Sequence, residues 1–176
     1  MTLAVRDATP ADAAAITRIY NEGIASRTAT FDTELCTVEE IATDLRADQD
    51  TYPAVVVSDG DDVLGFAWTS SYRNRACYDG IAEFSVYVAS AAHRRGVGRL
   101  ALSALIERCE RTGFWKILSR IFTDNTASRA LCAQAGFHEV GIYRNHAKLE
   151  GVWKDCVIVE RLLGEAAAKA RNDRIE

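Results

Sequence analysis

The sequence predicts a single α/β domain in which helices flank a mixed, mostly antiparallel sheet. The chain has 176 residues and 48% hydrophobic content, which suits one hydrophobic core. Its apolar patterns follow the order strand, helix, helix, three strands, helix, strand, helix, two strands, and this order is typical of an α/β sandwich. We expect the domain to cover residues 1–163, and we expect the polar, alanine-rich tail of residues 164–176 to fray.

Cap and turn residues justify the elements of the first half of the chain. Leu3 and Val5 alternate with polar neighbours and predict a strand. Thr9, Pro10 and Asp12 predict a helix start, with an N-cap, a proline at N1 and an acidic residue at N3. The other expected elements of this half are a second helix that opens with the capping box Thr37–Glu40, and the strands Ala54–Ser58 and Val63–Ser71 around the hairpin turn Asp59–Asp62.

In the second half of the chain, strands alternate with helices. The helix that begins at Val97 buries an apolar stripe and ends at Gly113, and Asn125 caps a shorter helix that ends at Gly136. The expected strands are Ile81–Val88, Lys116–Thr123, His138–Arg144 and Val152–Leu162.

Charge and cysteine usage exclude several classes of protein. The formal net charge is −4 with both signs interspersed, so we expect no nucleic-acid partner. Five scattered cysteines without a C-x-x-C pair argue against a disulfide framework and a zinc ribbon, and three scattered histidines offer no metal spacing. No apolar run approaches about 18 residues, and the first residues hold no cleavable hydrophobic segment. We therefore expect a cytoplasmic protein with no metal ion and no membrane partner.

The most informative segment is Ala82–Ala101, in which a basic turn joins an alternating strand to a helix. Two glycines allow backbone N–H groups to approach a phosphate, and the helix start adds the positive end of its dipole. Three arginines supply positive charge. The residues that we expect to form a pyrophosphate site are Arg94, Arg95, Gly96, Val97, Gly98 and Arg99.

Nucleotides and acyl carriers both contain the pyrophosphate that such a loop binds. Gly96, Gly98 and Ala101 fit the dinucleotide fingerprint, but the strand does not run directly into the first glycine. No acidic residue lies about 20 positions beyond to hold a ribose, and the Gly-Lys-Ser/Thr of a P-loop is missing. The remaining common ligand is a coenzyme A thioester.

The R-R-x-G-x-G loop after an S-V-Y-V strand resembles the GNAT superfamily of acyl-CoA N-acyltransferases, and the likeness covers most of the chain. The resemblance implies the GNAT fold with splayed fourth and fifth strands, acetyl-CoA as co-substrate, and a homodimer. Further segments resemble the phosphinothricin acetyltransferase group, which includes enzymes for methionine sulfoximine and arsinothricin. These segments are Thr28–Asp32, Arg75–Asp79, Glu83–Val88 and Gly151–Asp155. They imply an N-acetyltransferase that acts on the α-amine of a small amino acid analogue.

The strand before the loop supplies a candidate base. Glu83 points away from the apolar face of Phe84, because side chains alternate along a strand. An amine is protonated at neutral pH, so a base is required, and Glu83 matches the family's strand glutamate. A solvated or salt-bridged surface glutamate is the alternative. The same resemblance implies that the coenzyme arm contacts the backbone of Val86, Tyr87 and Val88. It also implies contacts with Asn125 and Ser128, at the start of the shorter helix that Asn125 caps.

Arg73 and Arg75 are the candidate ligands of an acidic acceptor group. In regular strand geometry they share one face and form an anion-binding fork, with exposed hairpin arginines as the alternative. The resemblance favours Arg75. Phe31 is a candidate wall of the acceptor pocket, or else a core aromatic.

Cys132 departs from the family pattern within the coenzyme site. Most relatives have tyrosine or histidine there as the proton donor to the departing thiolate, whereas a small thiol in a helix is more often a packing residue. Whether Cys132 donates a proton or no acid is needed stays open. His146 precedes the last hairpin, and we favour a structural role for it over contact with the acceptor.

Two other functions stay open at this point. One is acetylation of a different amine, on a protein N-terminus, a lysine or an aminoglycoside, which Arg73 and Arg75 disfavour by charge. The other is a coenzyme-sensing module without turnover, which Cys132 motivates. The sequence does not choose among acceptors that differ by a few atoms.

Overall fold

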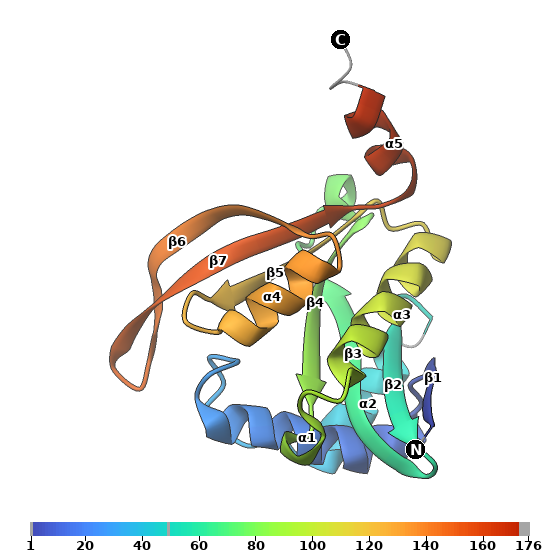
Figure 1. The fold of residues 1–176 in the computed structure, drawn as a ribbon, viewed down its shortest axis with the longest axis vertical. Coiled ribbons are helices and arrows are strands. Elements are labelled where there is room, and N and C mark those ends of the chain that lie inside the picture. Colours follow the sequence, from blue (N-terminus) through green and yellow to red (C-terminus); the bar gives the residue numbers. More distant parts are fainter. Residues whose placement is uncertain (1, 49, 173–176) are drawn as a thin grey trace.

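A computed structural model describes residues 2–48 and 50–172, and this part of the chain contains a seven-stranded sheet in the order β1-β2-β3-β4-β5-β7-β6 (Figure 1). The strands are β1 (Leu3–Asp7), β2 (Ala54–Asp59), β3 (Asp62–Ser71), β4 (Ile81–Val88), β5 (Lys116–Phe122), β6 (His138–Leu149) and β7 (Val152–Leu162). The helices are α1 (Ala13–Ser26), α2 (Val38–Asp48), α3 (Val97–Arg111), α4 (Thr126–Gln134) and α5 (Gly164–Asn172), with short 3₁₀ turns at Pro10–Asp12, Ala76–Tyr78 and Ser90–Ala92.

The sheet opens between β4 and β5. These two strands run parallel and pair only over Ile81–Glu83 and Lys116–Leu118 in the described residues, although both strands continue further. Every other neighbouring pair is antiparallel. The expected mixed sheet with splayed fourth and fifth strands is therefore confirmed, and the gap exposes the backbone of β4 beyond Glu83.

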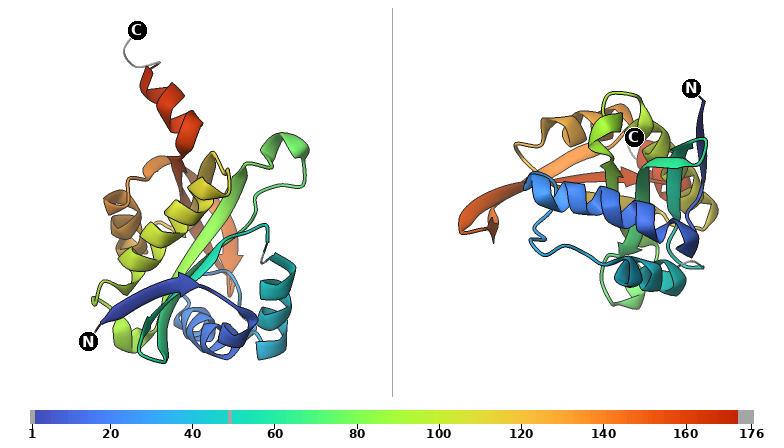
Figure 2. Two further views of the ribbon diagram at one scale, coloured as in Figure 1. Left: turned by 90° about the vertical axis from the view of Figure 1, so that its right-hand side faces the viewer. Right: turned by 90° about the horizontal axis from the view of Figure 1, so that it is seen from below.

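Helices cover both faces of the sheet, with α1 and α2 on one face and α3 and α4 on the other (Figure 2). On the first face, the ring of Tyr20 in α1 contacts the rings of Trp68 and Tyr87, with centroids 5.6 and 4.8 Å apart. On the second face, α3 approaches β3 at Gly65, where an added Cβ would lie 2.6 Å from Val97 Cγ1. The largest fully buried side chains come from both faces and include Ile16, Ile19, Phe66, Leu102, Leu105 and Ile117.

The predicted caps are confirmed. The backbone N–H and hydroxyl of Thr9 donate to Asp12 Oδ2 over 2.8 and 3.0 Å, and those of Thr37 donate to Glu40 Oε2 over 2.7 and 2.8 Å. Asp12 also accepts two hydrogen bonds from the Arg6 guanidinium, at 2.6 and 2.7 Å. These local contacts start the first turns at the expected positions.

The C-terminal segment differs from expectation. The expected frayed tail is wrong for residues 164–172, which form α5, whereas residues 173–176 lie outside the described residues. Alanine-rich composition favours a helix without burial, and the Gly164 N–H donates to a carboxylate oxygen of Glu110 at 2.9 Å. The helix projects away from the sheet (Figures 1 and 2). No helix among the described residues is long and apolar enough to cross a membrane.

Strand β6 is also longer than expected, reaching Leu149 instead of Arg144. Its register against β7 shifts between Tyr143 and Ala147, and Asn145 has a positive φ of 48°. Such a bulge interrupts the alternation that marks a strand in sequence, so the prediction stopped at the irregularity. With β7, the strand forms a hairpin that extends beyond the rest of the sheet (Figure 1).

Candidate functional site

The loop between β4 and α3 has the geometry of an anion site. Gly96 is the N-cap of α3 with a φ of +81°, a left-handed conformation that favours glycine. Because Gly96 has no side chain to cap the helix, the first N–H groups of α3 stay available to a ligand. Arg94 is also left-handed, with a φ of +61°, so the chain turns twice within three residues.

A cavity of about 820 Å³, here called the loop cavity, extends from this loop to Val86, on the part of β4 that no longer pairs with β5. Such a volume is in the range of sites for large organic ligands. It is bordered by the end of α1 on one side and by α4 on the other. The predicted coenzyme residues that line it are Val86, Tyr87, Val88, Arg94, Gly96, Val97, Gly98, Arg99, Asn125 and Ser128.

Glycine at position 98 fits the close approach between α3 and its neighbours. An added Cβ would lie 3.4 Å from side-chain atoms of both Val88 and Leu131, so a larger residue would narrow the cavity at this point. Arg95, predicted as a phosphate ligand, is instead placed beside the β2–β3 hairpin, where its Nη2 lies 3.5 Å from Asp59 Oδ2. It is not among the described residues that line the loop cavity.

Asn125 links α4 to the segment after α1. Its Oδ1 accepts from the Ser128 N–H at 3.1 Å, which confirms the predicted N-cap. Its Nδ2 donates to the carbonyl of Thr28 at 3.2 Å. The same residue therefore caps α4 and joins the two walls of the loop cavity.

Cys132 lies further inside, where a smaller space of about 70 Å³, the gap cavity, separates α4 from β4 and β5. Its side chain is buried, and burial raises the pKa of the thiol to about 12. The thiol is therefore protonated at neutral pH. Leu131, Asn125, Ser128 and Val86 also line this space.

A third cavity, of about 650 Å³, lies across the strand gap and is here called the Glu83 cavity. Arg73 and Glu83, two of the predicted site residues, both line this cavity. Glu83 Oε2 accepts a hydrogen bond of 2.6 Å from Nη2 of Arg120 on β5. The β6 bulge forms part of the cavity wall through Tyr143, Arg144, Asn145 and His146.

The predicted fork of Arg73 and Arg75 is wrong. Strand β3 ends at Ser71, so side-chain alternation does not extend to these arginines. Arg75 instead precedes a 3₁₀ turn, with its guanidinium 5.9 Å from the ring centroid of Tyr78, and it does not line the Glu83 cavity among the described residues. Arg73 alone of the two reaches the cavity.

Phe31 lies beside the Glu83 cavity rather than in its described lining. Its ring packs edge-on against Phe122, with centroids 4.8 Å apart, and lies 6.3 Å from the imidazole of His146. It thus supports a residue of the cavity wall. His146 itself lines the cavity, so its position fits contact with a ligand better than we expected from the sequence.

Sequence reasoning missed Arg120 and the side chains of the β6 bulge. Arg120 follows Leu118 at a spacing of two in a strand, and this spacing puts both on the same face. That signal is present in the sequence. The spacing alone does not show that Arg120 lies near Glu83. That follows only from the parallel register of β4 and β5, which pairs Leu118 with Glu83.

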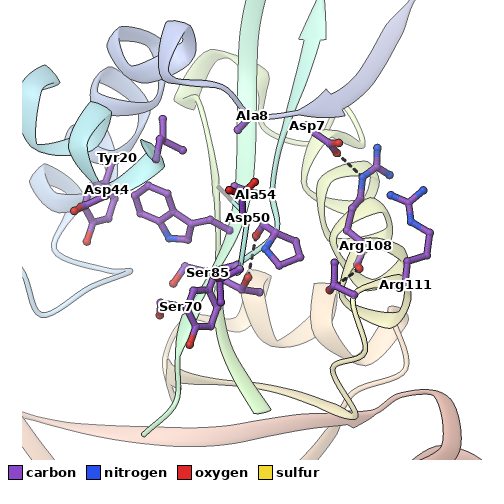
Figure 3. Close-up of a pocket in the computed structure, with 17 residues that line it drawn as sticks. Asp7, Ala8, Tyr20, Asp44, Asp50, Ala54, Ser70, Ser85, Arg108 and Arg111 are labelled. Carbon is purple, nitrogen blue, oxygen red and sulfur yellow. Dashed lines mark hydrogen bonds and ion pairs between the residues drawn. The ribbon is translucent and has the colours of Figure 1, made fainter. Parts of the chain in front are cut away.

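One further cavity of about 510 Å³, here called the outer cavity, is bordered by α2, the start of β2 and the end of α3 (Figure 3). Its wall includes an ion pair in which Arg108 Nε lies 2.7 Å from Asp7 Oδ1, and an exposed Arg111. None of the predicted site residues is among its described lining. We assign no chemistry to it.

Comparisons with known proteins agree with this geometry. Residues 16–137 match the family model described as the acetyltransferase (GNAT) family. The phosphinothricin N-acetyltransferase of Alcaligenes faecalis is 36% identical over 159 residues, covering 86% of this chain and 78% of that protein. The L-methionine sulfoximine/L-methionine sulfone acetyltransferase of Pseudomonas paraeruginosa is 32% identical over 166 residues, covering 91% and 94%.

A solved structure is similar over nearly the whole chain. The phosphinothricin acetyltransferase from Sinorhizobium meliloti, in complex with AcCoA, has a TM-score of 0.88 and 34% identity, covering 96% of this chain and 92% of that chain. The range matched by the family model contains the glycine loop, the strand gap and Glu83.

Proposed function

Because the chain belongs to the GNAT family of acetyltransferases, we propose that it transfers the acetyl group of acetyl-CoA to the α-amine of a small amino acid analogue such as phosphinothricin, methionine sulfoximine or arsinothricin. One observation carries the proposal: the loop cavity runs from an open helix N-terminus to the strand gap, beyond which Glu83 lies among arginines. The names of the two relatives support the acceptor class.

The loop and the strand gap fit the two ends of acetyl-CoA. The first N–H groups of α3, with Arg94 and Arg99, complement the negative charge of a pyrophosphate. The neighbouring glycines leave space for the phosphate groups to approach the backbone. The unpaired part of β4 offers backbone groups at Val86–Val88 for the pantetheine arm and the thioester carbonyl. Asn125 and Ser128 are the proposed contacts of the arm on α4.

The chemistry proposed for Glu83 is proton removal. The acceptor's ammonium proton passes to Glu83, directly or through a water molecule. The freed amine nitrogen attacks the thioester carbonyl carbon, so the C–N bond forms; as the C–S bond breaks, the thiolate of coenzyme A leaves and the nitrogen loses its second proton to solvent, which gives the neutral amide. We propose that Cys132 packs in the gap cavity rather than acting as an acid, because its pKa of about 12 exceeds the ordinary thiol value of about 8.5.

The charge of the Glu83 cavity favours an acidic acceptor. Arg73, Arg120 and Arg144 line it, and Glu83 is the single carboxylate among its described lining residues. A polycationic aminoglycoside would be repelled there, whereas a carboxylate, phosphinate or arsinate would be attracted. We therefore rank acetylation of other amines, and a coenzyme-sensing role, below the proposed activity.

We also propose a cytoplasmic homodimer. The cysteines are free thiols, as is usual in a reducing compartment. The β6–β7 hairpin carries large exposed apolar side chains, a pattern typical of protein–protein contacts. These side chains are Val140, Ile142, Tyr143, Val152 and Trp153. Two of them, Ile142 and Tyr143, also line the Glu83 cavity, so a partner subunit on this hairpin would border the acceptor.

A thiol-release assay tests the proposed function. Acetyl-CoA is supplied with phosphinothricin, methionine sulfoximine, a peptide amine and kanamycin in separate reactions. We expect thiol release with the first two acceptors and much less with the others. Release only with the peptide or kanamycin would overturn the acceptor class, and tight acetyl-CoA binding without thiol release from any amine would favour the coenzyme-sensing role.

A further inference from the structure

Arg120 connects two cavities that are otherwise separate. Among the described lining residues, it is the one shared by the gap cavity, where Cys132 lies, and the Glu83 cavity. It lies two residues beyond Leu118, the last residue of β5 that pairs with β4. Its side chain thus reaches back across the opening of the sheet to Glu83.

The contact between Arg120 and Glu83 is close and accessible. Their charged atoms lie 2.6 Å apart, and the side chains are 43% and 23% exposed. An exposed ion pair contributes little to stability, so a competing anion can replace one partner at small cost. While the contact lasts, Oε2 of Glu83 accepts from a guanidinium, and the positive charge held there opposes the approach of an ammonium ion to the same carboxylate.

The other cations of the Glu83 cavity are held differently. Arg144 Nη1 lies 3.3 Å from Asp155 Oδ2, and the guanidinium of Arg73 lies 5.2 Å from the ring centroid of Tyr72. Within the described residues, neither arginine forms an ion pair with Glu83. Arg120 is therefore the cation whose release would change the state of the candidate base.

We propose that Arg120 exchanges its partner when the acceptor binds. In the absence of acceptor, its guanidinium holds Glu83; an acceptor's acidic group then takes the guanidinium, and Glu83 is free to receive the ammonium proton. This inference rests on the proposed function and deepens it, because it makes an acidic group on the acceptor a condition for an available base. Amines without such a group leave Arg120 on Glu83.

The test uses one amine with and without its acidic group. Thiol release is measured with methionine sulfoximine and with its carboxamide, which keeps the amine but loses the carboxylate charge. The proteins are wild type, Arg120→Met and Arg120→Lys. Arg111→Met is the matched control, since Arg111 is an exposed arginine of the outer cavity, whose described lining contains none of the predicted site residues.

For wild type we expect kcat/KM to be higher for the acid than for the carboxamide. In Arg120→Met the value for the acid falls by about tenfold or more, since a charge-assisted hydrogen bond is lost. The value for the carboxamide stays level or rises, because Glu83 is no longer occupied. Arg120→Lys is intermediate, since lysine keeps the charge but not the planar fork. Arg111→Met behaves as wild type.

Two results would overturn the inference while leaving the proposed function intact. One is wild-type turnover of acid and carboxamide at the same kcat/KM. The other is an equal loss for both acceptors in Arg120→Met with an unchanged KM for the acid. Calorimetric titration of the acid into each protein in the presence of coenzyme A measures its affinity without turnover. If Arg120→Met binds the acid as tightly as wild type does, the inference is also overturned. Absent thiol release with every amine counts against the proposed function instead.

Discussion

At the scale of single residues, Glu83 has the surroundings of a base that is controlled by its neighbours. It faces three arginines and one imidazole across the Glu83 cavity, and it is part of the strand whose backbone borders the gap. Cys132 is the opposite case. Its thiol is buried, and its raised pKa makes it a poor acid for a thiolate that leaves at neutral pH.

Replacing Glu83 by Gln tests its role. The amide keeps the size of the side chain and one accepting oxygen, but it does not take up the ammonium proton. We expect kcat to fall by about 10²–10⁴, the usual worth of a general base, with the affinity for acetyl-CoA unchanged. Steady-state thiol release and calorimetry separate the two effects. Equal kcat in both proteins would remove the role assigned to Glu83.

At the scale of elements, the start of α3 is the most sensitive position. We expect Gly96→Ala to cost about 1–2 kcal/mol in stability, since a Cβ is strained at a φ of +81°, although nothing lies within 4 Å of it. The variant should also bind acetyl-CoA more weakly, because relief of the strain turns the N–H groups away. Gly113→Ala is the control: Gly113 has a φ of +90° and equally open space, but it follows the other end of α3.

Thermal unfolding and calorimetry on both glycine variants check this prediction. Both should lose similar stability, and only Gly96→Ala should lose coenzyme affinity. A Gly96→Ala protein that binds acetyl-CoA as tightly as wild type would contradict the assignment of this loop.

The first turn of the chain gives a pH dependence. The hydrogen bond from Arg6 and those from Thr9 hold the pKa of Asp12 below its ordinary value of 3.8. A lowered folded-state pKa contributes stability above the ordinary value, and this contribution is lost as the pH falls through the folded pKa. Asp12→Asn should therefore cost about 1–2 kcal/mol at pH 7 and progressively less below about pH 4. Urea unfolding of both proteins across this range measures the difference, and a constant gap down to pH 2 would contradict the assignment.

Local signals predicted most of the elements. The bounds of β7 at Val152–Leu162 and the start of α3 at Val97 agree with the structure, because alternation, caps and positive-φ glycines act within a few residues. The bulge of β6 was missed, since it leaves no clear local pattern, and side-chain alternation was extended to Arg73 and Arg75 although β3 ends at Ser71, as predicted. The resemblance to the family favoured Arg75, whereas the structure places Arg73 in the lining of the Glu83 cavity.

The site was predictable only where it is continuous in sequence. Apart from Arg95, the glycine-loop residues predicted for the coenzyme line the loop cavity, because they are neighbours along the chain. Arg120 and the β6 bulge join Glu83 only through the pairing of β4 with β5 and of β5 with β7. Long-range register of this kind has no signature in one sequence.

At the scale of the whole molecule, the proposed dimer depends on the projecting β6–β7 hairpin (Figure 1). We expect light scattering to give twice the chain mass of 19.3 kDa. Trp153 is 54% exposed, so Trp153→Glu should shift the mass toward the monomer without unfolding the chain. Trp115→Glu is the control, since Trp115 is exposed and immediately precedes β5, outside the hairpin. Its ring packs on Gly80, so thermal unfolding of this variant is measured beside its mass. A monomeric wild-type protein at assay concentration would contradict the dimer.

The whole account depends on the ligand of the loop cavity. Isothermal titration of the wild-type protein with acetyl-CoA, and separately with a nicotinamide dinucleotide, tests this most directly. We expect saturable heat with acetyl-CoA at one site per chain and none with the dinucleotide. Folded protein that gives no heat with acetyl-CoA but binds the dinucleotide would contradict the account.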